Sequence, residues 1–324
     1  MSEMSDTGVP PELRPRQADL GYDLAKTLTG LVSLRTRIPE DAATARILGT
    51  ERGGHGVLLD EQGLVLTIGY LVAEAEQAWI VDHRGQAVTA EILAYDYASG
   101  FGLLRGLGRL AGSPLQLGSA AALAAGDTVV VAGAGGIGWS LSAKVTALTE
   151  FTGYWEYLLE RAIFTAPAHP DWGGAALLDA QGHLCGIGSL YLENVVGEGA
   201  PRAGNMSVPV DLLVPILEDL SRYGQVPGPA RPWLGVFVAQ TADALVIGGL
   251  YPGGPGAAVL REGDVILALG DTPVRELPAF YRQLWALGEA GVEVPLRISR
   301  DRRVLELRLR SIDRRDAWKK PQVH

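Results

Sequence analysis

Cysteine is almost absent from this chain of 324 residues, which contains Cys185 and no other. A single cysteine cannot form a disulfide within the chain, and it excludes a metal site built from several cysteines. Because Cys185 lies in the apolar run of residues 184–187, we expect it to be a small buried hydrophobe. The residues therefore predict neither a disulfide-stabilised protein nor a metal centre.

Positive charge is also scarce. The 28 Lys and Arg residues are outnumbered by 37 Asp and Glu residues, which gives a formal net charge of −9. Surfaces that bind nucleic acid usually carry a concentrated basic face, so nucleic acid is not an expected partner. No apolar run approaches the roughly 20 residues of a membrane span. Residues 1–19 lack the basic start and apolar stretch of a secretion signal, which predicts a cytoplasmic location.

Turn residues and short apolar segments, in contrast, are abundant. The chain has 42 Gly and 19 Pro, and from residue 19 onward Gly, Asp and Pro separate apolar runs, a rhythm typical of an all-β fold. We predict a disordered tail over residues 1–18, a β domain over 19–224, a linker over 225–232, a second unit over 233–311 and a fraying tail over 312–324. The predicted strands of the first domain are 31–35, 56–59, 64–67, 78–81, 91–95, 101–104, 128–132, 143–148, 163–165, 176–178 and 184–188.

The second unit begins after the Pro-rich linker. It is expected to be a small β barrel with one prominent helix over residues 277–287. The first domain should end in a helix, because Leu213, Ile216, Leu217 and Leu220 have helical spacing and Gly224 follows. The predicted strands of the second unit are 235–238, 244–247, 265–269, 294–298 and 304–309.

Residues 54–60 (GHGVLLD) and 63–67 (GLVLT) resemble the stretch that leads to the catalytic histidine in the HtrA/Deg family of trypsin-like serine proteases, and Tyr70 stands at the matching position. Residues 90–96 (AEILAYD) and 101–104 (FGLL) look like the segment around the catalytic aspartate, which places Gly100 at that position.

The nucleophile loop of the family resembles residues 169–179 (HPDWGGAALLD), with Trp172 at the serine position. Residues 182–187 (GHLCGI) and 207–211 (SVPVD) match the strands that come after it. The motifs 233–236 (WLGV) and 263–266 (GDVI) resemble a PDZ domain. The resemblance implies an all-β fold, a trypsin-like double β-barrel followed by one PDZ domain, that is a small β barrel with helices.

The matching positions lack all the groups of a catalytic triad. A phenol such as Tyr70 keeps its proton at neutral pH, because its ordinary pKa is about 10. Trp172 offers only an indole N–H donor, and Gly100 has no side chain. The loop over 169–174 is also one residue shorter than the family's by our alignment. We expect the oxyanion-binding amides to be redirected and the Trp172 indole to plug the cleft.

A relocated site remains an alternative. His169 with Asp171, close to Trp172, is the first pair to consider, although His169 can also be an ordinary loop residue. A metal site from this pair lacks the three or four converging ligands that such sites use. The Gly-rich residues 133–138 suggest a dinucleotide loop, but no βαβ pattern surrounds them. We interpret them as a wall of the substrate pocket, and we predict no cofactor.

The implied PDZ domain supplies the remaining chemistry. Such a domain adds a peptide to its sheet edge, while successive backbone N–H groups bind the terminal carboxylate. The candidate donors are Leu234, Gly235 and Val236, and Leu284 is a candidate groove residue. The helix carries two i, i+4 pairs, Phe280/Leu284 and Tyr281/Trp285, and the sequence leaves open which pair faces the groove. It also leaves open whether the fold binds no peptide at all.

Aromatic residues gather after the middle of the chain. They are either a partner surface or a core that fills the lost cleft: Trp139, Phe151, Tyr154, Trp155 and Tyr157.

Two classes of function are consistent with the sequence. The first is a catalytically inactive scaffold or regulator that binds peptides or proteins with a free C-terminus through the PDZ domain. The alternative is a serine-type endopeptidase or other hydrolase with a relocated active site, which needs a nucleophile, a base and an acid in hydrogen-bond reach. The resemblance also implies a homo-trimer or an assembly with an active HtrA/Deg protein.

Overall fold

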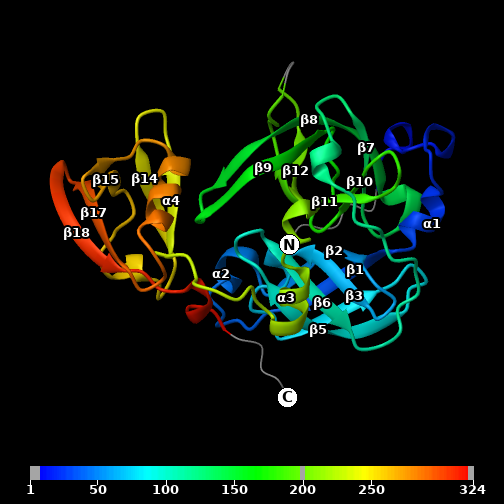
Figure 1. The fold of residues 1–324 in the computed structure, drawn as a ribbon, viewed down its shortest axis with the longest axis horizontal. Coiled ribbons are helices and arrows are strands. Elements are labelled where there is room, and N and C mark those ends of the chain that lie inside the picture. Colours follow the sequence, from blue (N-terminus) through cyan, green and yellow to red (C-terminus); the bar gives the residue numbers. More distant parts are fainter. Residues whose placement is uncertain (1–7, 198–200, 320–324) are drawn as a thin grey trace.

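The computed structural model describes residues 8–197 and 201–319, and its first half is built around a closed six-stranded barrel (Figure 1). Its strands pair in the order β1-β2-β3-β6-β5-β4. Their short apolar runs are largely buried in the barrel. The bounds are β1 (Leu31–Arg37), β2 (Glu51–Leu58), β3 (Leu64–Ile68), β4 (Gln77–Val81), β5 (Ala87–Tyr95) and β6 (Phe101–Gly106).

A second closed barrel follows, with the order β10-β11-β12-β9-β8-β7. One large cluster of buried residues combines side chains from both barrels, for example Leu66 and Met206. The two barrels therefore share a core, and loops at their junction can meet. The bounds are β7 (Thr128–Ala132), β8 (Ser140–Gly153), β9 (Tyr157–Ala166), β10 (Ala176–Leu178), β11 (Leu184–Leu192) and β12 (Gly204–Pro209).

The long hairpin β8–β9 differs from the sequence prediction. Strands were expected only over residues 143–148 and 163–165, but the pairing continues to Gly153 opposite Tyr157. The hairpin reaches from the second barrel toward helix α4 (Leu277–Ala286) of the C-terminal unit (Figure 1). This extension places the hairpin tip against the C-terminal unit.

The C-terminal unit, residues 233–312, has its own buried core. Its six strands form one sheet in the order β13-β14-β15-β17-β18, with β16 paired to β15, so the expected small barrel is instead an open sheet. Because β13 and β18 do not pair, β13 is left as an edge strand. The bounds are β13 (Val236–Gln240), β14 (Leu245–Leu250), β15 (Val265–Leu269), β16 (Thr272–Pro273), β17 (Glu293–Arg300) and β18 (Arg303–Arg310).

The described parts of both tails, residues 8–18 and 312–319, are more ordered than the sequence predicts. Residues 1–7 lie outside the described part of the chain, but Val9 is fully buried in the second barrel and its N–H donates to the carbonyl of Gly138 over 2.8 Å. At the other end, Trp318 packs with Trp233 and Tyr251. Apolar burial of single side chains therefore fixes segments whose overall composition is polar. Residues 320–324 lie outside the described part.

The α-helices are short and few among the described residues. Apart from α4, they are α1 (Leu24–Leu28), α2 (Ala45–Leu48) and α3 (Leu217–Tyr223), and none is long and apolar enough to cross a membrane. The last of these ends, as expected, at Gly224, whose φ of 70° is the left-handed conformation that closes many helices. Cys185 is fully buried, which confirms its predicted role in the core.

Candidate functional site

The structure brings the three positions that match the triad close together at the junction of the barrels. Tyr70 lies in the short helix Gly69–Leu71, directly after β3, and the N–H of Gly69 donates to the carbonyl of Gly100 over 2.7 Å. Burial around the Tyr70 hydroxyl raises its pKa, and a side-chain hydrogen bond joins it to Trp172. A phenol held neutral in this way cannot act as a general base at neutral pH.

Gly100 occupies a place in which a side chain does not fit. Its φ is 87°, and an added Cβ atom would lie 2.9 Å from the hydroxyl oxygen of Tyr157. That hydroxyl donates to the carbonyl of Ser99 over 2.6 Å, so the tyrosine is fixed. An aspartate at this position would be strained and would displace Tyr157.

Trp172 is partly buried rather than enclosed. Its ring centroid lies 5.5 Å from that of Tyr191, an exposed residue of β11. The indole thus stands between Tyr70 and Tyr191, at the position that the sequence predicts for the nucleophile. An indole can donate one hydrogen bond and cannot attack a carbonyl.

A histidine that sequence reasoning did not select dominates the neighbouring loop. Nε2 of His55 lies 3.0 Å from Oδ2 of Asp171, and its Nδ1 accepts from the N–H of Ala134 over 3.0 Å. The proton of a neutral His55 is therefore on Nε2, facing the carboxylate. Burial opposes ionisation of Asp171, but its contact with His55 and its electrostatic interactions with His55 and His169 hold its pKa below the usual range.

His169 has a different role from the predicted pairing with the Asp171 side chain. It is fully buried; its Nδ1 accepts from the backbone N–H of Asp171 over 3.1 Å, and its Nε2 lies 3.0 Å from the carbonyl oxygen of Trp139. Burial lowers the pKa of His169. It is a neutral histidine that holds loops together, which agrees with the loop-residue interpretation.

The Gly-rich residues 133–138 form part of this arrangement. A Cβ atom on Gly133 would lie 2.5 Å from Nε2 of His55, so glycine is needed for the loop to pass the ring. The sequence contains both the histidine and the glycine loop. Only the tertiary fold shows that His55 lies against this loop, so the pair could not be identified from local patterns.

The neighbourhood of His55 does not supply a nucleophile. In the described part of the chain, the polar partners of its ring are Asp171 and a backbone N–H. Serine proteases also draw an oxyanion-binding N–H from the residue two positions before the nucleophile. Pro170 stands there, and proline has no N–H. This signal was present in the sequence and was missed.

A second candidate site lies in the C-terminal unit. The backbone N–H groups of Leu234, Gly235 and Val236, all predicted donors, converge on the carboxylate of Glu156 at the tip of the β8–β9 hairpin. The nitrogen to oxygen distances to Oε1 are 3.2, 2.8 and 3.1 Å respectively. Gly235 has a φ of 72°, the left-handed conformation that lets its N–H turn toward the carboxylate.

Burial raises the pKa of Glu156 to about 7, against the opposing effect of the three N–H donors. Among the described residues, its carboxylate is the group that accepts from all three donors, and Arg314 contributes a weaker favourable charge. The three donors suit an anionic oxygen, and the group that they bind comes from within the same chain, although burial disfavours its charged form.

Helix α4 contributes Tyr281 rather than Leu284 to this contact. The Tyr281 hydroxyl donates to the carbonyl of Gly153 over 3.1 Å and accepts from the N–H of Glu156 over 3.0 Å. Leu284, the predicted groove residue, is fully buried in the core of the unit. Of the two predicted pairs, Tyr281/Trp285 is thus the one with a polar contact to the hairpin.

The aromatic residues divide between the two predicted alternatives: Tyr157 lies in the core shared by the barrels with Phe151 and Trp155 packed against it, whereas Tyr154 is exposed. Phe151, Trp155 and Tyr157 pack on one another along the hairpin, with Trp155 stacked on Tyr157 at 5.6 Å. Tyr154, more than half exposed, contacts the ring of Phe237 in β13. The group therefore stiffens the hairpin and extends it to the C-terminal unit.

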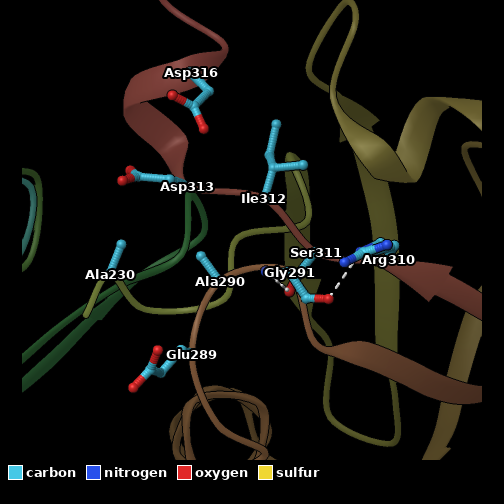
Figure 2. A pocket seen from close by; sticks show the side chains of 9 residues that line it. All are labelled: Ala230, Glu289, Ala290, Gly291, Arg310, Ser311, Ile312, Asp313 and Asp316. Carbon is cyan, nitrogen blue, oxygen red and sulfur yellow. Dashed lines mark hydrogen bonds between the residues drawn. The ribbon is translucent and has the colours of Figure 1, made fainter.

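A pocket of about 450 Å³ opens elsewhere, where the linker meets the C-terminal unit. Figure 2 shows three carboxylates around it, from Glu289, Asp313 and Asp316, while the guanidinium of Arg310 turns to the carbonyl of Gly291. None of its lining residues belongs to the barrel junction or to the amide loop, as we call residues 234–236 with their three N–H donors. In the described residues no group of three or more His, Cys, Asp or Glu side chains could hold a metal ion.

Comparison with known proteins agrees with the double-barrel architecture. The family model of the trypsin-like peptidase domain matches residues 54–187. Serine endoprotease DegS of Haemophilus influenzae is 25% identical over 225 residues, which cover 67% of this chain and 65% of DegS. The putative serine protease HhoA of Synechocystis is 22% identical over 273 residues, covering 76% and 66%. The chain is thus similar in sequence to HtrA-type serine proteases.

Solved structures of HtrA-type proteases have the same fold. The protease AlgW with a tripeptide superposes with a TM-score of 0.53 at 20% identity, covering 92% of this chain and 97% of that one. A serine endoprotease from Yersinia pestis gives 0.52 at 19% identity, covering 90% and 98%. This chain spans about half to two thirds of the length of the first curated relatives it matches.

Proposed function

We propose that this protein is not a peptidase and that it binds the free carboxyl termini of peptides or proteins through its C-terminal unit, acting as a PDZ domain. The observation that carries the proposal is the convergence of three successive N–H groups, from Leu234, Gly235 and Val236, on one carboxylate oxygen. Three convergent amides beside an edge strand are the arrangement with which such domains capture a terminal carboxylate.

The loss of peptidase activity rests on independent features of the barrel junction. Tyr70, Gly100 and Trp172 provide no base, no orienting carboxylate and no nucleophile. Pro170 removes one oxyanion donor, so the residual acceleration that an intact oxyanion hole can give without a triad is not expected either. The His55–Asp171 pair favours the hydrolase alternative only in part, because a base and an acid without a nucleophilic oxygen or sulfur do not form a covalent intermediate.

Titration of the full chain with matched peptides tests the binding proposal. A fluorescein-labelled pool of decapeptides that end in Val with a free carboxylate is compared with the same pool amidated at its end. Amidation removes the anion and should weaken binding roughly ten- to a hundredfold. Equal binding of the two pools contradicts carboxylate recognition.

A further inference from the structure

The tip of the β8–β9 hairpin has a conformation adapted to its contact with the C-terminal unit. Glu156 immediately precedes β9, and its φ of 57° lies in the left-handed region that is uncommon for a residue with a side chain. The residue is only 6% exposed. A glutamate that is strained and buried at a hairpin tip is retained only where its surroundings hold it.

The contact between the hairpin tip and the C-terminal unit contains both interactions that capture a peptide by strand addition, a carboxylate bound by backbone N–H groups and a backbone hydrogen bond to the edge strand. The Glu156 carboxylate occupies the amide loop, and two residues earlier the carbonyl of Tyr154 accepts from the N–H of Val238 in β13 over 2.8 Å. Since β13 is the edge strand of its sheet, the hairpin tip takes the place that an added peptide strand would use. The side-chain carboxylate of Glu156 stands in for a terminal carboxylate.

Further contacts hold the hairpin in place. Tyr281 bonds to the backbone of Gly153 and Glu156. On the outside, the guanidinium of Arg282 pairs with the carboxylates of Glu150 in β8 and Glu160 in β9. This outer pair is exposed and contributes little to docking. The buried carboxylate and its three donors are therefore the contact that decides whether the hairpin docks.

One carboxylate fills the amide loop, so the hairpin and an outside peptide exclude each other. We propose that the hairpin tip, residues 154–156, is an internal ligand of the C-terminal unit and that peptides with a free carboxyl terminus bind by displacing it. The inference rests on the proposed function, since it assigns the regulation of that same peptide site. When a peptide displaces the hairpin tip, β13 and the hairpin lose their mutual contact. Because the hairpin belongs to the second barrel, peptide binding is coupled to that barrel.

The magnitude of the effect is set by competition. A peptide binds only the fraction of molecules in which the hairpin has left the groove, and its apparent affinity falls by that fraction. Removal of charge-assisted hydrogen bonds shifts such an equilibrium roughly ten- to a hundredfold. A variant without the Glu156 carboxylate should therefore bind the free-acid peptides at least about tenfold more tightly.

The experiment uses the full chain and the fluorescein-labelled, Val-terminated decapeptide pool, in its free-acid and amidated forms. Anisotropy titrations compare the wild type with Glu156→Ala and with Glu160→Ala, a matched control on the same hairpin that does not reach the amide loop. Tyr281→Phe is a second variant, which loosens the hairpin backbone and leaves the three donors intact. Near-ultraviolet circular dichroism shows which variants keep native packing.

The expected result is tighter binding of the free-acid pool by Glu156→Ala, a smaller gain for Tyr281→Phe, and wild-type affinity for Glu160→Ala. Equal affinity of the wild type, Glu156→Ala and Tyr281→Phe for the free-acid pool, with the amidated pool weaker throughout, overturns the internal-ligand proposal and leaves the proposed function standing. If no folded form prefers the free-acid pool, the proposed function fails, and displacement fails with it.

Discussion

Oε1 of Glu156 lies 2.8 Å from the backbone nitrogen of Gly235, although the two residues are 79 positions apart. The contact joins the tip of the second barrel's hairpin to the amide loop of the C-terminal unit. A carboxylate at this place is enclosed by protein, while its charge depends on pH. Docking of the hairpin should therefore respond to protons.

The first prediction is that hairpin docking weakens as pH rises. Burial raises the pKa of Glu156 to about 7 from its ordinary 4.5, so the docked state binds a proton that the undocked state releases. The stabilisation that Glu156 gives to the docked state is fully present below pH 4.5. It is lost as pH rises through about 7, and the total loss is up to about 3 kcal/mol. Arg314, which opposes the shift, and the Tyr281 hydroxyl are the charged and titratable groups that face it.

Hydrogen-exchange protection of the Leu234, Gly235 and Val236 amides, corrected for intrinsic exchange, should fall between pH 5 and pH 8. Glu156→Gln carries no titrating group and should give a flat profile. A wild-type profile that is also flat, or that rises with pH, would show that the buried carboxylate does not govern docking.

The second prediction is that rebuilding the triad does not restore proteolysis. In the variant Tyr70→His, Gly100→Asp, Trp172→Ser, the new aspartate meets the Tyr157 hydroxyl at about 2.9 Å from its Cβ atom. The oxyanion donor also stays missing at Pro170. Neither the wild type nor the variant should hydrolyse unfolded casein or react with a fluorophosphonate probe. Labelling of the serine introduced at position 172 in the variant, or of any residue in the wild type, would refute this account of the site.

The sequence predicts most of what local patterns control. Apolar runs bounded by Gly and Pro locate nearly every strand of both barrels, and the position of α4 agrees within one residue at its end. The Leu234–Gly235–Val236 donors were also predicted, from the resemblance of residues 233–236 to a PDZ domain and from the close backbone approach that a glycine allows. Their use for an outside peptide stays a prediction.

Long-range contacts lie beyond such reasoning. The extension of β8 and β9 depends on aromatic packing and on support from the C-terminal unit, so tertiary context decides where pairing stops. Val9 and Trp318 are also placed by tertiary contacts. Each is a single apolar residue in a polar tail, and each packs against residues that are distant in the sequence. His55 and Asp171 are separated by most of the double barrel in sequence, and only the closed fold joins them.

The third prediction concerns Trp172, whose indole the sequence predicts to plug the cleft. A fully packed core tryptophan costs about 3–5 kcal/mol on truncation. Because this indole is only partly buried, between Tyr70 and Tyr191, Trp172→Ala should lower the free energy of unfolding by roughly 1–2 kcal/mol. Urea denaturation measures the change. A loss below about 0.5 kcal/mol would place the indole in solvent, and one above about 3 kcal/mol would make it a true core residue.

The last prediction tests whether glycine at position 133 is required by His55. An alanine there would bring its Cβ within 2.5 Å of Nε2 of a histidine that is held by Asp171 and by the N–H of Ala134. The ring cannot move without breaking these contacts, so Gly133→Ala should destabilise the protein by roughly 1–3 kcal/mol, as overpacking does. Gly138→Ala is the matched control in the same loop, because its Cβ would meet no atom within 4 Å. Urea denaturation of both variants should show a clear loss for the first and a change within about 0.5 kcal/mol for the second. Equal stability of the two would mean that His55 is free to move, and the His55–Asp171 contact would then not be a fixed feature of the barrel junction.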